Sequence, residues 1–394
     1  MSQRFREPLN VLAQPKLLWG GARRPTGWNR SDIGDRLRGK YSWRKTPFAP
    51  SDIENRLDAF RLASAGRSQR LRKNWTPRGA PDRQLEDLRM SVVQQASEDV
   101  VALYDAFAPW YDVMCAAQGR KRQAYRPDVA DAYLRLFSDL NVESVLDCAC
   151  GTGDPLIGLA KRGERRLRLV GSDGSRGMLA MCALNAIFPE PETGGRPLTV
   201  HPFGAAGSGG GIELMTCRWE ELPSRCGSDH FDVVMCVGHA LYHAMTREAM
   251  VAALRTMAAV TRPGGYVVFD SKRWTPDLRG ELGRPGPRDL VKWRGWTEYG
   301  GGRVMFLDST AYEADEGALS GIAQVMRFYV LQERGGELRE RRAYPFAGAP
   351  FHPETAMELL EGAGLEDVKL DPLDGSIAPD YVERCVTIIG QKPK

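Results

Sequence analysis

Two acids and a glycine-rich turn make up the part of the sequence best suited to chemistry. In the stretch "VLDCACGTGD" an apolar strand pattern leads into Asp147, and Gly151 and Gly153 follow it. Glycine reaches positive φ without strain and lets the backbone approach a ligand closely. Asp173 comes 20 residues after Gly153, a spacing at which a carboxylate accepts both hydroxyls of a ribose. The combination predicts a site for an adenosine-type ligand.

Alternating strand and helix patterns predict the framework that positions these residues. Strand patterns cover residues 144–149, 167–173, 212–217, 231–238 and 265–270, and helical patterns cover 128–140, 154–163, 176–187 and 246–261. Such alternation predicts an α/β fold, in which a parallel sheet carries helices on both faces. Asp154 and Pro155 suit the start of the helix after the turn, because an acid complements the helix dipole and proline loses no needed donor.

The pattern changes after Asp270. Residues 302–314, 321–333 and 337–346 are typical of antiparallel strands, and a helix at 352–364 and strands at 365–372 and 384–391 follow. We interpret residues 274–348 as an antiparallel lid or substrate region, inserted before the last helix and strands of the core, residues 349–394. Residues 189–211, rich in Gly and Pro, predict a flexible surface loop.

A basic N-terminal extension, residues 1–95, precedes the core. Residues 1–90 carry 20 Lys/Arg against 9 Asp/Glu, whereas the remainder carries 34 against 41. Prolines, glycines and aromatic residues are scattered through this extension, and only residues 51–65 have a helical pattern. We therefore interpret it as an arm rather than a domain.

The composition narrows the class of protein. Hydrophobic residues make up 42% and charged residues 26% of the chain, as in globular proteins. No apolar run approaches the roughly 18 residues of a membrane helix, and the first residues lack a secretory signal, so we expect a cytoplasmic protein without a membrane partner. The 8 cysteines include no C-x-x-C pair, which favours reduced core thiols over disulfides or a zinc site.

The loop is unlike a dinucleotide-binding loop. The third glycine of G-x-G-x-x-G falls at Leu156, which argues against a pyrophosphate. With Asp147, the loop resembles motif I of class I S-adenosylmethionine-dependent methyltransferases, and "RPGGYVVFD" resembles the turn into their fifth strand. The resemblance implies a Rossmann-like core over residues 96–273, with the loop backbone against the methionine part of the cofactor.

Further segments resemble glycine N-methyltransferases and their glycine/sarcosine relatives. They are "GSDGSRGML", "CRWEELP", "FDVVMCVGHALYHA" and "RPGGYVVFDSKRW". By this resemblance Asp173 holds the ribose, Met178 and Trp219 lie near the adenine, and an arginine meets the cofactor carboxylate. The implied cofactor residues are Arg126, Asp147, Cys150, Gly151, Gly153, Asp173, Gly174, Met178, Arg218, Trp219 and Val237. Trp219 is also consistent with ordinary core packing.

The segment after the fourth strand faces the acceptor in this family. His239, Tyr242 and His243 lie there, and the two histidines, four residues apart, are expected on one helical face. Their spacing suggests zinc, but no H-E-x-x-H glutamate and no third ligand is evident. We expect a polar wall that orients the acceptor, although each histidine also suits a structural role. Where the family has a substrate-gripping arginine this sequence has Lys272, which is not equivalent.

These observations predict a methyltransferase that uses S-adenosylmethionine, with S-adenosylhomocysteine as product, and methylates a small molecule, more readily at nitrogen. Position and exclusion of water supply most of the rate, so a dedicated base is not required. Two alternatives remain open: an RNA methyltransferase that uses the basic arm, and a non-catalytic cofactor-binding partner protein. Nucleic acid is the less favoured partner, and a homo-oligomer is expected by analogy with the family.

Overall fold

The computed structural model describes residues 100–117, 127–163, 167–188, 197–205, 211–273, 290–299, 302–373 and 385–394. All described residues belong to one compact unit, Arg78–Lys394. The predicted basic extension and the candidate cofactor residue Arg126 lie outside the described residues. In the part that is described, no helix has the length and apolar character needed to cross a membrane.

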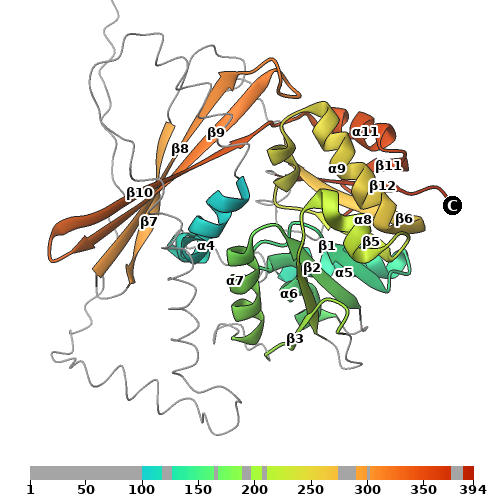
Figure 1. Ribbon diagram of the computed structural model, residues 1–394, viewed down its shortest axis with the longest axis horizontal. Helices are drawn as coiled ribbons and strands as arrows, with labels where there is room; N and C mark the ends of the chain where they lie inside the picture. The colour runs from blue at the N-terminus through green and yellow to red at the C-terminus, as the bar shows by residue number, and fades with distance from the viewer. Residues whose placement is uncertain are drawn as a thin grey trace, which may run out of the picture. The chain divides into compact units, whose positions relative to one another are not determined.

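An eight-stranded sheet in the order β11-β12-β6-β5-β1-β2-β4-β3 organises the described core (Figure 1). Its strands are β1 (Ser144–Asp147), β2 (Arg168–Asp173), β3 (Val200–Pro202), β4 (Ile212–Thr216), β5 (Phe231–Cys236), β6 (Thr261–Lys272), β11 (Glu366–Leu370) and β12 (Cys385–Gln391). Neighbouring strands are parallel from β3 to β6, and β12 pairs antiparallel with β6 and β11. The carboxyl ends of β1, β2 and β5 therefore meet at one edge, where open α/β sheets bind ligands.

Helices cover both faces of this sheet, because successive residues of a strand point to opposite sides. Val145 and Val233 face the core under α5, α6 and α7, whereas Leu146 and Val234 face the core under α8, α9 and α11. The helix bounds are α5 (Pro127–Asp139), α6 (Asp154–Arg162), α7 (Arg176–Ile187), α8 (Leu222–Cys226), α9 (Arg247–Val260) and α11 (Pro353–Gly362). Two 3-10 helices, η4 (Trp219–Glu221) and η5 (Ala240–Ala244), precede α8 and α9.

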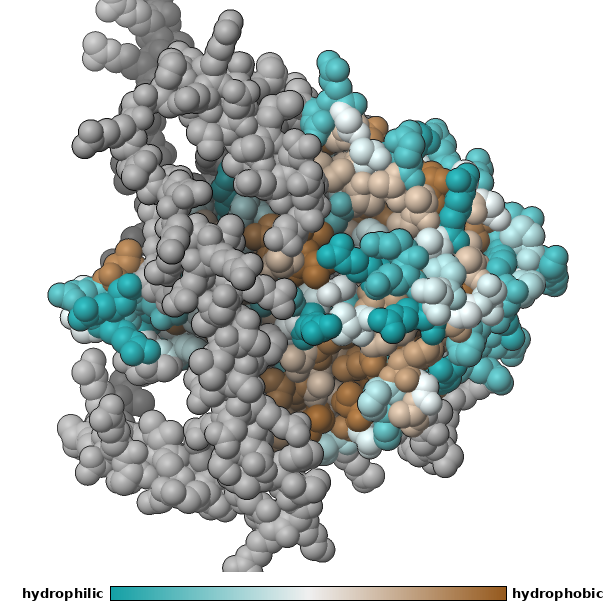
Figure 2. Space-filling model, viewed as in Figure 1, coloured by the Kyte–Doolittle hydropathy of each residue, from teal (hydrophilic) through white to brown (hydrophobic). Residues whose placement is uncertain are grey.

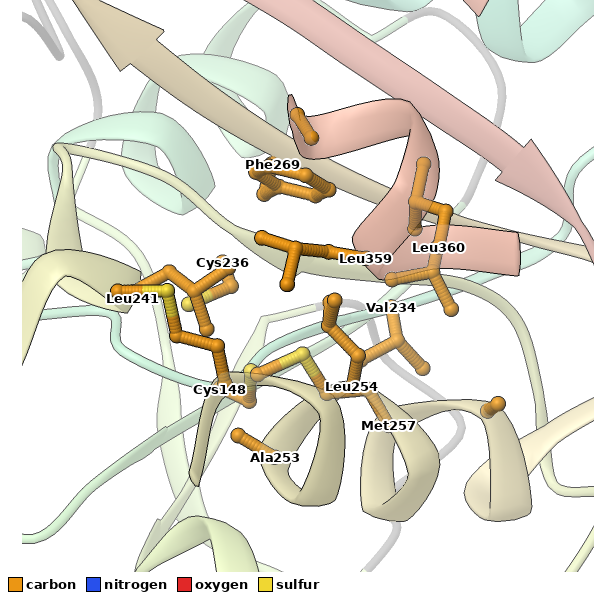
Figure 3. Close-up of a cluster of buried hydrophobic side chains, with 14 of the residues drawn as sticks. Cys148, Val234, Cys236, Leu241, Ala253, Leu254, Met257, Phe269, Leu359 and Leu360 are labelled. Atoms are coloured by element: carbon orange, nitrogen blue, oxygen red, sulfur yellow. The ribbon is translucent and has the colours of Figure 1, made fainter. Parts of the chain in front are cut away.

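The core under α9 and α11 is made of fully buried side chains from distant segments. Figure 3 shows Leu254 of α9 and Leu359 of α11 beside Val234 and Phe269 of the sheet. Each is 0% exposed. Burial of such a side chain contributes roughly 1.5–3 kcal/mol, so this layer holds α11 on β5 and β6.

A second, antiparallel sheet follows β6 in the sequence, in the order β10-β9-β8-β7. Its strands are β7 (Leu290–Tyr299), β8 (Gly302–Ala314), β9 (Ile322–Arg334) and β10 (Glu337–Gly348). It packs on α4 (Val100–Ala117), which lies between it and α7 in Figure 1. Phe107 of α4 stacks on Phe328 at a ring distance of 5.2 Å, and Tyr344 and Phe346 are buried in the same cluster.

The surface drawn in Figure 2 is uneven in character. Hydrophilic residues cover the right-hand edge of the view, and hydrophobic residues gather around α7. Ile187 and Phe188, at the end of that helix, are 39% and 47% exposed. The next residues of the chain, 189–196, lie outside the described part.

The α/β class, the central strands and helices and the antiparallel strands agree with the sequence prediction, but two strands were missed. The prediction of a loop over 189–211 is wrong at Val200–Pro202, which forms β3 at the sheet edge. Three residues are too few to show an alternating pattern. The second missed strand, β7, has a register shift between Trp293 and Gly295. A bulge of this kind changes which face the following residues point to and removes the period of two from the sequence.

Candidate functional site

The loop after β1 uses its two glycines in different ways. Both have positive φ, +52° at Gly151 and +91° at Gly153. A Cβ on Gly153 would lie 2.4 Å from the Sγ of Cys182, so this glycine lets the loop pack against α7. A Cβ on Gly151 would meet no atom within 4 Å. The loop is thus anchored at Gly153, and at Gly151 its backbone faces open space.

Asp147, at the end of β1, is fully buried, and its carboxylate is only half satisfied. Its Oδ1 accepts a hydrogen bond of 3.3 Å from the backbone N–H of Ala149. Its Oδ2 has no hydrogen-bond partner among the described residues. Burial raises the pKa of this carboxyl from 3.8 to about 7, against the smaller opposing effect of the Ala149 bond. Because unpaired buried carboxylates are costly, the geometry fits a ligand that brings a donor or positive charge.

Asp173, at the end of β2, joins the two loops that surround this point. Its Oδ2 accepts from the N–H of Gly151 at 2.9 Å, and its Oδ1 accepts from the N–H of Ser175 at 2.8 Å. Burial raises the pKa of Asp173 to about 6, although both hydrogen bonds act in the opposite direction. Each carboxylate oxygen keeps a second lone pair, so these bonds are compatible with the predicted contact to ribose hydroxyls.

Helix α4 contributes an acid that the sequence analysis missed. Asp105 Oδ1 accepts from Ser175 Oγ at 2.6 Å and from the N–H of Gly177 at 2.8 Å, at the start of α7. A Cβ on Gly174 would lie 2.9 Å from a methyl group of Val101, and one on Gly177 would lie 2.9 Å from the backbone O of Asp105. The glycines of "GSDGSRGML" therefore allow α4 to lie directly over the end of β2.

A second acid of α4 holds the glycine loop itself. Asp112, 2% exposed, accepts from Thr152 Oγ1 at 3.0 Å and from Asn185 Nδ2 at 2.8 Å. Asp105 and Asp112 are seven residues apart, which is two turns of one helix face. That spacing, in an otherwise apolar helix, is the sequence signal that identifies them.

The remaining candidate cofactor residues surround the same strand ends. Cys150 and Met178 are buried, and the N–H of Met178 donates to Ser175 Oγ at 3.1 Å. Trp219 is half-buried, packs against the core and donates from Nε1 to the backbone O of Cys148 at 3.0 Å. Arg218 is exposed. The structure thus joins Trp219 to the glycine loop and leaves the Arg218 side chain toward solvent.

A small depression lies between α5 and α6. It is lined by Val129, Ala130, Tyr133, Asp154, Pro155, Gly158, Leu159 and Val237. Val237 is the candidate cofactor residue that it reaches, at the end of β5. The depression therefore extends from the glycine-loop helix toward the segment expected to face the acceptor.

His239 follows β5 in a left-handed turn. Gly238 has φ +81° and His239 has φ +62°. Their N–H groups donate to the two carboxylate oxygens of Asp270 at 3.0 and 2.7 Å, which fixes the turn on β6. Burial lowers the pKa of His239, so that its ring is neutral at physiological pH. Cys385 of β12 reaches the same point, with its Sγ 3.9 Å from His239 Nε2.

The expectation that His239 and His243 share a helical face is wrong. Residues 240–244 form a 3-10 helix, and His239 stands before it in a left-handed conformation. In a helix of three residues per turn, positions four apart point in different directions. His239 lies by Asp270 and Cys385, whereas His243 lies by Tyr104 of α4. No single metal or acceptor position is shared by the two rings.

His243 has both ring nitrogens occupied. Its Nδ1 lies 2.7 Å from the backbone O of Ala347 in β10, and a carbonyl only accepts, so Nδ1 carries the proton. Its Nε2 then accepts from the hydroxyl of Tyr104, 3.0 Å away. Burial lowers the pKa of His243, in keeping with this neutral form. The histidine links α4, η5 and the second sheet.

The other candidate acceptor residues also have partners within the protein. The buried hydroxyl of Tyr242 is bonded to Ser271 Oγ and to the N–H of Lys272, both at 2.9 Å. Burial raises the pKa of Tyr242, which keeps its proton in place. Lys272 Nζ donates to Gln324 Oε1 of β9 at 2.9 Å, and Arg273 pairs with Asp371. Lys272 thus stands where the large sheet meets the antiparallel one.

The central part of the chain matches a known family. Residues 146–269, from β1 to β6, match the family model described as a methyltransferase domain. The resemblance noted in the sequence is confirmed: the chain contains a methyltransferase domain, of the class that uses S-adenosylmethionine. The fold and the half-satisfied Asp147 carboxylate are consistent with that class.

Two kinds of relatives are similar to this chain. Glycine/sarcosine N-methyltransferase from Parasynechococcus marenigrum (strain WH8102) is 25% identical over 187 residues, which cover 48% of this chain and 54% of that protein. The match spans about half the length of this relative. Among solved structures, the sugar N-methyltransferase KedS8 from Streptoalloteichus sp ATCC 53650 is 18% identical to this chain, with a TM-score of 0.49. The alignment covers 72% of this chain and 93% of KedS8. The amino pentose methyltransferase CalS10 from Micromonospora echinaspora is 19% identical with a TM-score of 0.48, covering 72% and 96%.

Proposed function

We propose that this protein transfers a methyl group from S-adenosylmethionine to the nitrogen of a small amine or guanidine. The observation that supports this best is the buried Asp147 carboxylate. Its Oδ2 lacks a partner among the described residues, and the neighbouring Gly151 faces open space. Both lie within the residues that match the methyltransferase domain.

In this proposal the cofactor lies across the ends of β1 and β2. Asp173 binds its ribose hydroxyls and Asp147 meets its polar methionine end, directly or through water. Met178 and Trp219 lie against its adenine. When bound, the cofactor supplies a methyl group on a positively charged sulfonium. The acids of α4 hold the loops over this site, which excludes water from it.

The chain's own contribution to the chemistry is to position a neutral acceptor. The acceptor nitrogen uses its lone pair to form the new N–C bond while the C–S bond breaks, so it must lose any extra proton first. Tyr242 and His243 are held by protein hydrogen bonds, whereas His239 has a lowered pKa. We therefore assign the proton to solvent before the acceptor binds, and orientation to these side chains.

The acceptor is proposed to be an amine that differs from glycine. A similarity of 25% to a glycine/sarcosine N-methyltransferase favours nitrogen as the reacting atom. Lys272, however, stands where an arginine would grip a carboxylate by two parallel hydrogen bonds. Its ammonium, close to the second sheet, suits a single contact to an anionic or carbonyl oxygen of the acceptor.

Transfer of a labelled methyl group to a panel of amino acids, amines, guanidines and phenols, run beside bulk tRNA, tests this function. Label in an amine or guanidine is the expected result. Label only in RNA, with affinity that falls steeply with salt, would replace the small-molecule assignment by the alternative use of the basic arm. Binding of S-adenosylhomocysteine without transfer to any acceptor would leave a non-catalytic cofactor-binding protein.

We further propose a homo-oligomer and a cytoplasmic location, both from the resemblance and the sequence pattern. Light scattering on the purified full chain tests the first. Fractionation of cells that express the tagged protein tests the second.

A further inference from the structure

Three side chains with metal-binding atoms converge beside the proposed acceptor position. They are His239 after β5, Asp270 on β6 and Cys385 at the start of β12. One ligand atom from each lies within 4.8 Å of the other two, and His239 Nε2 lies 3.9 Å from Cys385 Sγ. Asp270 is buried and the other two are half-buried.

The sheet itself brings these residues together across 146 positions of sequence. In the pairing of β12 with β6, Thr387 lies opposite Asp270 and Cys385 lies opposite Lys272. Cys385 and Asp270 are therefore diagonal neighbours on one face of the pair. His239 joins them because β5 is the other neighbour of β6. Three adjacent strands thus fix the positions of the three side chains.

One of the three spacings is close to that of a tetrahedral metal site, and the others, within 4.8 Å, require shifts of about 1 Å at most. Zinc binds histidine nitrogen and carboxylate oxygen at roughly 2.0–2.2 Å and thiolate sulfur at about 2.3 Å, which separates neighbouring ligand atoms by roughly 3.3–3.8 Å. The His239–Cys385 separation of 3.9 Å needs almost no adjustment. The set also combines imidazole, thiolate and carboxylate, which together favour zinc over magnesium or calcium.

Surrounding contacts hold the ligands in the required orientation. The N–H groups of Gly238 and His239 donate to the Asp270 carboxylate and fix its orientation, and each oxygen keeps a second lone pair. The ring of Tyr242 meets the His239 ring edge-on at 5.5 Å and restricts its rotation. Such secondary contacts are typical of metal sites, where they orient the ligating side chains.

We propose that His239, Asp270 and Cys385 bind one divalent transition metal ion, zinc in the first place, with a fourth position left for an exogenous ligand. In the sequence only the spacing of His239 and His243 suggests zinc, without a third ligand; in the tertiary structure the neighbours of His239 are Asp270 and Cys385. The next step rests on the proposed function: we assign the fourth coordination position to an oxygen atom of the acceptor, close to its reacting nitrogen. The nitrogen itself keeps its lone pair for the methyl group.

Cobalt(II) is the probe for this site, because it replaces zinc and its absorption reports a bound thiolate. The full chain, freed of metal by chelation and kept reduced with a phosphine, is titrated with cobalt(II). We expect one equivalent bound with a sulfur-to-cobalt charge-transfer band. The band is lost in Cys385→Ser, and cobalt affinity falls at least tenfold in His239→Ala. Cys115→Ser, a half-buried thiol outside the cluster, is the matched control and keeps both.

Absence of stoichiometric cobalt binding by the folded wild-type chain overturns the site, as does a charge-transfer band that persists in Cys385→Ser. Affinity for S-adenosylhomocysteine, measured in parallel, checks that each variant is folded. It also separates this proposal from the function proposed above. Binding of the cofactor product without cobalt overturns the metal site alone, and cobalt binding without methyl transfer to any acceptor overturns the proposed function alone.

Discussion

The ends of β1 and β2 and the ends of β5 and β6 lie at the same edge of one sheet, yet they are built in opposite ways. At β1 and β2 the loop backbone faces open space and the buried Asp147 keeps an unsatisfied oxygen. At β5 and β6 the polar groups of Tyr242 and His243 are satisfied by Ser271, Tyr104 and Ala347.

This difference separates a region with an unsatisfied carboxylate oxygen, the proposed cofactor end, from a region in which the hydroxyl of Tyr242 and both ring nitrogens of His243 have protein partners. Backbone N–H groups and two acids prepare the first, so it is suited to a ligand of fixed chemistry. Contacts from α4, β10 and β12 complete the second, and these can change without altering the first. The comparison predicts that changes at β1 and β2 alter cofactor binding, whereas changes at β5 and β6 alter stability or the acceptor.

The largest effect is expected from the titration of Asp147 in the ligand-free protein. Its pKa rises from 3.8 in the unfolded chain to about 7 in the folded one. Folding therefore takes up a proton between these values, and stability falls as the pH rises through them. Over the whole pH range between the two pKa values, the free energy of unfolding falls by on the order of 4 kcal/mol. Urea unfolding from pH 5 to 8 should show this slope, and Asp147→Asn should reduce it to the smaller contribution of Asp173, whose pKa is also raised, to about 6. Equal slopes in both proteins would contradict the half-satisfied carboxylate.

The glycine loop offers a matched pair of substitutions. In Gly153→Ala the new methyl group meets Cys182 Sγ, whereas in Gly151→Ala it meets open space. Both variants place an alanine at a positive φ, so this cost is common to the two. We therefore expect Gly153→Ala to be less stable than Gly151→Ala by about 1–3 kcal/mol, the cost of overpacking. Gly151→Ala should mainly weaken S-adenosylhomocysteine binding. Thermal unfolding and calorimetric titration measure the two effects, and equal stability losses would show that the loop is not packed on α7 as described.

Asp173→Ala should weaken S-adenosylhomocysteine affinity by about 1–3 kcal/mol, the scale for hydrogen bonds to charged groups. Asp131→Ala, which removes a partly exposed acid paired with Arg162, is the control and should leave affinity unchanged. Calorimetric titration of both variants decides the matter. An Asp173→Ala protein that is folded and binds with wild-type affinity would place the adenosine site elsewhere.

Tyr104→Phe tests the region at β5 and β6, in which Tyr242 and His243 have protein partners. The change removes the hydroxyl that donates to His243 Nε2 and leaves the ring contacts with Phe346. We expect a loss of about 1 kcal/mol in the free energy of unfolding, with the intrinsic rate of methyl transfer kept within a few-fold. Denaturant unfolding and single-turnover kinetics measure these quantities. A large loss of rate without a loss of stability would instead place His243 in the chemistry.

The smallest effect is expected at Lys272. Lys272→Ala should raise the KM for the methyl-accepting amine by about fivefold, which corresponds to at most about 1 kcal/mol for a partly exposed charge. S-adenosylhomocysteine affinity should stay the same, because Lys272 lies at β6 and not at the glycine loop. Steady-state kinetics and titration measure the pair. An unchanged KM would remove Lys272 from the acceptor site.

The sequence by itself determined the α/β sheet and the loops that form the proposed cofactor end of the site. Gly151, Gly153 and Asp173 work through backbone conformation and through their place at strand ends, and both are local properties that spacing along the chain records. The glycine loop, the acid at the end of β2 and the helix that begins at Asp154 are all where the sequence predicts them. The seven-residue spacing of Asp105 and Asp112 marks one face of a helix, but only the packing of α4 on α7 shows that this face meets the loops.

Only the tertiary structure decided the acceptor end. The sequence predicted that His239 and His243 face one position, but a 3-10 helix and a left-handed turn send them to different partners. Cys385 and Ala347, more than 100 residues away along the chain, reach this point through β12 and β10. The physical reason is that side chains at strand ends take their neighbours from adjacent strands. Strand order and register are set by burial of the whole sheet, not by spacing along the chain.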